Sequence, residues 1–177
     1  MLTAEVIAAL SPTSTGYRLL LLGHLLSVII GFGSTFVYPV LGAQTSKHKG
    51  EAGAAISDAA EKAGKFVTEP FVIASGLFGI LLVLAGPFNF DALWIQAALT
   101  LYVLAMVFSF AVHVPNLKKL NELAQQMAAG RPPEAGAGGP PPQVVEMERR
   151  GKAAARNGGI LHLAFAALLI LMIFKPA

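Results

Sequence analysis

Four long apolar segments constrain the fold of this chain more than any other feature. They cover residues 17–41, 70–86, 92–114 and 158–175, and their only charged residues are Arg18 and Lys175, at the ends. About 20 helical residues cross the roughly 30 Å hydrocarbon core of a membrane. The sequence therefore predicts four membrane-spanning helices, with little room for a domain outside the membrane.

Composition excludes several classes of protein. The chain is 55% hydrophobic and 13% charged and has no cysteine, which is far from the average of soluble domains and rules out disulfides, thiolate metal sites and thiol catalysis. It carries no Walker, HExxH or CxxCH motif, and none of the four spans contains a carboxylate that could move a proton or an ion. We therefore expect no nucleotide loop, pump or carrier.

The basic residues predict how the chain is oriented. Eleven of the 13 lysines and arginines lie in the connections between spans one and two and between spans three and four, whereas Arg18 and Lys175 lie at the opposite end. Cytoplasmic loops keep the excess of basic residues. We therefore expect both of these connections in the cytoplasm and both termini outside. The charge predicts contact with anionic lipid headgroups rather than with nucleic acid.

The connections predict helical extensions into the cytoplasm. The stretch "NLKKLNELAQQMA" places apolar residues on one helical face, so we expect the third helix to continue beyond a kink at Pro115 as a solvated end. The stretch "EAGAAISDAAEKAGKF" favours a helix whose alanine face can bury little area. Residues 130–143 are rich in glycine and proline, which predicts a flexible linker.

Small residues recur at helical spacing in the first two spans. Gly23, Ser27 and Gly31 follow one another every four residues, and Ser75 and Gly79 repeat the interval. Such stripes let helix backbones approach closely in lipid. We expect these five residues to lie at helix contacts.

Three of the four histidines lie in apolar surroundings, and they are the candidate functional residues. His24 falls beside the small-residue stripe and well inside the first span, so we expect it to face the bundle, apart from the other two. His113 and His162 lie near one membrane boundary and could approach each other if their helices are neighbours.

Two interpretations of the histidines stay open. In the preferred one, each ring hydrogen-bonds a backbone carbonyl or a hydroxyl of the next helix, and no cofactor is bound. In the other, the rings ligate haem b or copper. Intramembrane ionisable residues are functional candidates by default, so we retain the second interpretation.

Several quoted segments carry a resemblance to a known family. The segments "LLGHLLSVIIGFGSTFV", "EPFVIASGLFGILLV", "PNLKKLNEL" and "LILMIFKP" resemble bacterial predicted integral membrane proteins of unknown function. The four-span pattern is distantly similar to copper-resistance membrane proteins and to the small membrane protoporphyrinogen oxidases of haem synthesis. The resemblance covers most of the chain except the linker. It implies a four-helix fold, a bacterial membrane and a histidine in the first span, and it implies no activity.

Together these observations predict an all-α, integral membrane four-helix bundle in the bacterial plasma membrane. We expect a single membrane domain over residues 1–177 that acts, without enzyme activity, as an accessory or packing component of a larger membrane assembly. Its partners would be the lipid bilayer and either other membrane subunits or further copies of the chain. The alternative is a haem- or copper-binding redox protein, or a haem-synthesis enzyme, that uses His24, His113 or His162.

Overall fold

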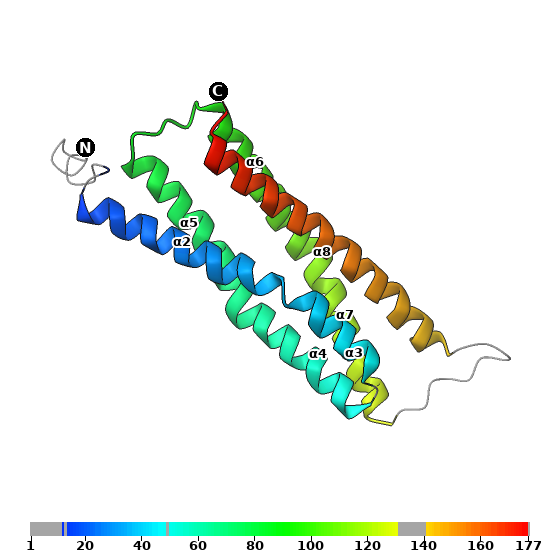
Figure 1. Ribbon diagram of the computed structural model, residues 1–177. Helices are drawn as coiled ribbons and strands as arrows, with labels where there is room; N and C mark the ends of the chain where they lie inside the picture. The colour runs from blue at the N-terminus through cyan, green and yellow to red at the C-terminus, as the bar shows by residue number, and fades with distance from the viewer. Residues whose placement is uncertain (1–11, 13, 49, 131–140, 177) are drawn as a thin grey trace.

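The chain folds into long helices that lie alongside one another (Figure 1). The computed structural model describes residues 12, 14–48, 50–130 and 141–176, and every regular element in those ranges is a helix. Four helical stretches are long and apolar enough to cross a membrane, namely Thr15–Lys47, Glu51–Ala85, Leu93–Ala128 and Pro142–Phe174. The predicted all-α bundle of four membrane helices is confirmed.

The first stretch is interrupted where a single helix was expected over 17–41. Helix α2 (Thr15–Thr35) begins at Ser14, whose hydroxyl accepts a hydrogen bond from the Tyr17 N–H at 3.2 Å, and a short turn separates it from α3 (Tyr38–Lys47). Pro39 lies in the first turn of α3 and has no N–H to offer the carbonyl four residues earlier, which belongs to Thr35. The first helix therefore ends at Thr35.

Proline also shapes the second stretch. It consists of α4 (Glu51–Ala63), a π-helical turn over Gly64–Thr68 and α5 (Glu69–Ala85). Glu69, directly before Pro70, donates its N–H five residues back to Gly64. A proline ring clashes with the carbonyl four residues before it, and a wider turn relieves that clash while the helix continues.

The third stretch repeats this solution at Pro115. It consists of α6 (Leu93–Phe108), a π-helical turn over Ser109–His113 and α7 (Val114–Ala128). Val114, directly before the proline, donates its N–H to Ser109. The helix therefore runs on beyond Pro115 through a wide turn.

The fourth stretch is one unbroken helix, α8 (Pro142–Phe174). At 1.5 Å per residue it is about 50 Å long, which exceeds the hydrocarbon thickness by about 20 Å. It ends at Lys175, which adopts the left-handed conformation and donates its N–H to Leu171. The Lys175 ammonium lies 4.8 Å from the centre of the Phe88 ring and 5.6 Å from that of Trp94, so it fastens the end of α8 to the α5–α6 turn.

The helices pack mainly in pairs. In the apolar half, α2 lies along α5 and α6 lies along α8, while α4 contacts both α3 and α7 at the other end. Figure 1 shows the start of α2, the α5–α6 turn and the end of α8 together at one end of the molecule. We call this the terminal end, and the end formed by α3, α4, α7 and the first half of α8 the basic end.

Outside the apolar half, α7 is docked where a solvated end was expected. Gln125 of α7 donates from its Nε2 to the carbonyl of Ala54 in α4 at 2.9 Å, and Asn121 donates to Glu61. Leu123, Asn121 and Ala54 are buried. The expectation of a solvated helix end is therefore wrong. Asn121 and Gln125 are polar, and the sequence position of a polar side chain does not tell whether it faces water or another helix.

The expected linker over 130–143 overlaps residues 131–140, which lie outside the described residues. Helix α8 begins at Pro142, so the last part of that range belongs to the helix. Pro142 occupies the first turn of α8, where the missing N–H costs no hydrogen bond.

Candidate functional site

The His24 side chain joins α2 to α5. It is buried, and its Nδ1 lies 2.9 Å from the backbone oxygen of Ser75. A carbonyl oxygen only accepts, so Nδ1 carries a proton and donates this hydrogen bond. A Cβ atom at Gly79 would lie 3.4 Å from the His24 ring, so the glycine leaves the space that the ring occupies.

The small residues of the first two spans lie where α2 and α5 are closest. A Cβ atom at Gly31 would be 2.8 Å from the Val72 nitrogen, so the two backbones are in contact. A Cβ atom at Gly23 would be 2.8 Å from the Phe78 ring. Ser27 and Ser75 are buried between the helices.

The carbonyl of Val72 is the point where α5 meets α6. It accepts a hydrogen bond from the Tyr102 hydroxyl at 2.9 Å and another from the Ser75 hydroxyl at 2.7 Å. The Tyr102 ring lies over Gly76, where any side chain would collide with it. Because Gly31 also contacts Val72, α2, α5 and α6 converge on one residue.

The His162 side chain joins α8 to α2. Its Nε2 lies 2.9 Å from Thr35 Oγ1, and its ring stacks on Phe36 with 4.6 Å between ring centres. The Thr35 hydroxyl donates to the Phe32 carbonyl at 2.6 Å, so its oxygen accepts from His162. Nε2 of His162 therefore carries a proton.

His113, in the π-helical turn of the third stretch, packs against α8. Its Nδ1 is buried and has no hydrogen-bond partner among the described residues, and its ring lies 3.9 Å from where a Cβ atom of Gly158 would be. His162 follows Gly158 by one turn of α8, about 6 Å of rise, so the His113 and His162 rings lie at neighbouring levels of the bundle. His24 is separate, since about 16 Å of helix rise lies between it and Thr35.

A cluster of three hydroxyl groups, from Ser34, Tyr38 and Thr68, was not predicted from the sequence. Thr68 Oγ1 lies 2.8 Å from the Ser34 hydroxyl and also pairs with the Tyr38 hydroxyl. It ties the second stretch to both parts of the first, at the break between α2 and α3. Lone hydroxyls in apolar segments carry no spacing signal, so only the nearby Pro39 and Pro70 mark this place in the sequence.

Two histidine rings toward the basic end of the bundle are the candidate ligands for haem or copper. His113 packs at Gly158 of α8, one helical turn from His162, and the His162 Nε2 is already used in its bond to Thr35. Within the described ranges, no group of three or more His, Cys, Asp or Glu residues is placed to hold a metal ion. The haem or copper interpretation of this region concerns the imidazoles of His113 and His162.

The helices and their polar contacts define a four-span integral membrane protein whose intramembrane side chains join helices. Residues 18–176 match the family model described as predicted integral membrane protein (DUF2269), and the chain belongs to this family. Comparisons with curated proteins and with solved structures gave no match. The expected distant similarity to copper-resistance proteins and protoporphyrinogen oxidases stays a prediction.

Proposed function

We propose that the protein is a non-enzymatic accessory component of a larger assembly in the bacterial plasma membrane. The first support comes from how its intramembrane polar groups are used. His24, His162 and Tyr102 each hydrogen-bond a neighbouring helix. Groups that could otherwise bind or transform a substrate are engaged in holding the bundle together.

The observation that carries the proposal is that the four helices bury few of their residues against one another. In the most apolar stretch of each of the four helices, 11% of the residues are buried. Backbones approach closely within the α2–α5 and α6–α8 pairs, and the two pairs meet mainly through side chains such as Tyr102 and His162. Long apolar faces remain open for helices of another subunit, which pack in lipid by shape and close contact.

We further propose that the basic end faces the cytoplasm. Eleven of the 13 basic residues belong to connections at that end, and the positive-inside bias acts on short connections of this kind. Arg18 and Lys175 would then lie at the outer surface, where long basic side chains reach the headgroups.

Photo-crosslinking in native membranes tests the accessory role. A photoreactive residue replaces one exposed leucine on each membrane helix in turn, at Leu19, Leu77, Leu104 and Leu163. The matched control is Leu168, which lies on α8 like Leu163 but is buried. We expect a discrete protein adduct of constant mass from at least one exposed position and none from Leu168. Lipid adducts alone, together with a single copy of the 18.5 kDa chain and no other subunit in each native nanodisc, would contradict the proposal.

A second candidate function rests on the His113 Nδ1 atom. Among the described residues this buried ring nitrogen has no partner, which is uncommon, and the ring packs against α8 one turn from His162. Two imidazoles suffice to ligate a haem iron axially. The candidate is a haem-binding redox protein, and an absorption spectrum distinguishes it from the accessory role.

A further inference from the structure

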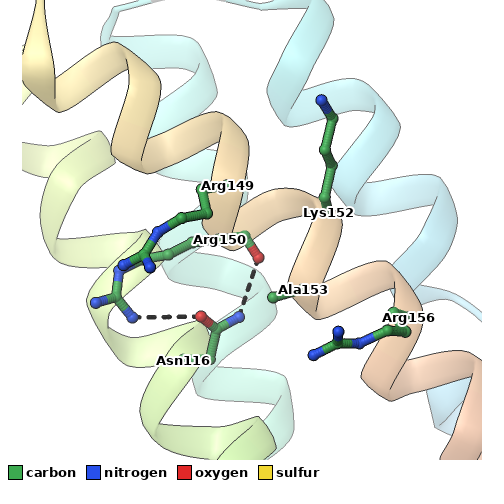
Figure 2. A pocket seen from close by; sticks show the side chains of 6 residues that line it. All are labelled: Asn116, Arg149, Arg150, Lys152, Ala153 and Arg156. Atoms are coloured by element: carbon green, nitrogen blue, oxygen red, sulfur yellow. Dashed lines mark hydrogen bonds between the residues drawn. The ribbon is translucent and has the colours of Figure 1, made fainter.

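A basic cavity lies between α7 and α8 at the basic end of the bundle. Its volume is about 420 Å³, and it is lined by Asn116 of α7 and by Arg149, Arg150, Lys152, Ala153 and Arg156 of α8 (Figure 2). The α8 members occupy one side of the helix, with Ala153 between Arg149 and Arg156 at helical intervals of four and three residues. The cavity therefore presents several cationic side chains to a single space.

Reciprocal hydrogen bonds hold one wall of this cavity. Asn116 donates from Nδ2 to the Arg150 carbonyl at 3.0 Å, and Arg150 donates from Nη1 to Asn116 Oδ1 at 3.3 Å. Figure 2 shows the Arg149 and Arg150 guanidinium groups on one side of Asn116 and the Arg156 guanidinium directed toward the same space from the other side. Ala153 lies between them, and its small side chain leaves the space open.

The cavity keeps positive charge after its ion pairs are counted. Glu146 lies 2.8 Å from Arg149 Nε and 2.7 Å from Arg150 Nε, although the latter is not aligned for a hydrogen bond, and Glu148 lies 2.7 Å from Lys152. Hydrogen bonds from Arg149 lower the pKa of the Glu146 carboxyl, so it stays ionised at neutral pH. Among the described residues Arg156 makes no ion pair. The lining residues and their ion-pair partners together carry four cations and two carboxylates.

A separate apolar groove lies further along α8, between α8 and α6. Its volume is about 200 Å³, and its lining comes from α6 (Leu101, Leu104, Ala105 and Phe108) and α8 (Ile160, Leu161 and Ala164). Ile160 follows Arg156 by about one helical turn, or roughly 6 Å. The cationic cavity thus lies at the edge of the apolar sequence, and the groove begins about one helical turn further along α8.

We propose that the cavity and the groove together bind one anionic phospholipid. The phosphate is held by Arg150 and Arg156, since guanidinium groups donate two parallel hydrogen bonds to phosphate oxygens. One acyl chain lies in the groove between α6 and α8. Basic pockets between membrane helices are suited to anionic headgroups, and the residual positive charge favours a lipid of net negative charge over a zwitterionic one.

The groove favours a lipid over a free phosphate ion. Inorganic phosphate needs the cavity alone, whereas a phospholipid gains from both parts. Filling the groove therefore separates the two ligands. Ala164→Leu adds bulk to the groove without touching the arginines, and Arg156→Gln removes a cation without touching the groove.

Native mass spectrometry of the detergent-solubilised, delipidated protein tests the proposal. Phosphatidylglycerol, phosphatidylcholine and inorganic phosphate are titrated separately. We expect phosphatidylglycerol to bind at least tenfold more tightly than phosphatidylcholine, and Arg156→Gln to weaken it about tenfold, as expected for a lost hydrogen bond to a charged group. Ala164→Leu should also weaken it, and Glu146→Gln, which removes a competing carboxylate, should tighten it.

The control is Lys119→Gln, which removes a cation of α7 that is paired with Glu122 and does not line the cavity. It should leave lipid binding within twofold, and unchanged thermal melting shows that each variant is folded. Equal binding of the two lipids, or binding that Arg156→Gln leaves unchanged, overturns the proposal. Tight binding of inorganic phosphate, with no effect of Ala164→Leu on phosphatidylglycerol, overturns the assignment to a lipid.

Discussion

His24 of α2 and Ser75 of α5 are joined by a 2.9 Å hydrogen bond from an imidazole nitrogen to a backbone oxygen. Both residues are buried, and the ring sits over Gly79. A carbonyl of an intact helix already accepts a bond from its own helix, so this second donor adds a contact between helices without disturbing either one. The histidine is therefore a structural tie within the membrane.

Replacing His24 should weaken folding by a modest amount. His24→Ala removes the donor, and interhelical hydrogen bonds in membranes are worth about 0.6 to 2 kcal/mol. His24→Gln retains an N–H donor and should lose less. Leu25→Ala, at an exposed neighbouring position, is the matched control. The free energy of unfolding in bicelles measures all three, and equal losses for His24→Ala and Leu25→Ala would argue against the tie.

Two glycines of α2 should respond in opposite ways to the same substitution. At Gly31 a Cβ atom would lie 2.8 Å from the Val72 nitrogen, so Gly31→Ala must push α2 and α5 apart and should cost about 1 to 3 kcal/mol. At Gly33 nothing lies within 4 Å, so Gly33→Ala should be neutral or stabilising by up to about 1 kcal/mol. Thermal melting of the two variants compares them directly. Similar losses at both positions would show that the α2–α5 contact is misplaced.

The distribution of basic residues predicts the sidedness of the chain. Reporters active only in the cytoplasm or only outside it, fused at Gly136 and at Ala177, should give opposite signals. Gly136 should report the cytoplasm and Ala177 the outside. The same signal at both positions would exclude four spans, and reversed signals would place the basic end outside.

Residues 131–140 are predicted to act as a spacer, because they are rich in glycine and proline and carry no large apolar side chain whose burial could offset the entropy of ordering them. Replacing them by a Gly/Ser tract of equal length, with 141–143 retained because α8 begins at Pro142, should leave thermal stability unchanged. A loss of several degrees would show that the segment packs against the bundle.

The membrane part of the fold could be predicted because lipid imposes simple rules. Apolar segments of sufficient length must be helices, and small residues at four-residue intervals mark close contacts, as at Gly31. The break after Thr35 could also have been predicted, since Pro39 withholds the N–H that Thr35 would use. The wide turns before Pro70 and Pro115 follow the same physics, but sequence alone does not choose between a kink and a π-helical turn.

The basic end could not be predicted in the same way. Asn121 and Gln125 look like solvated helix positions, yet they contact α4. In the wall of the basic cavity, Asn116 of α7 is hydrogen-bonded to Arg150 of α8. This pairing depends on how α7 and α8 cross. Contacts that depend on the crossing of two helices leave no periodic trace in either helix.

The absorption spectrum of the protein, purified from native membranes in nanodiscs without added cofactor, tests the central claim most directly. That claim is that His24 and His162 hold helices together and ligate no haem iron. The account predicts no Soret band in the native protein and none in His24→Ala, His113→Ala or His162→Ala, while His24→Ala and His162→Ala melt at lower temperature than the native protein. A stoichiometric Soret band that any of these substitutions removes would contradict the account and establish haem ligation.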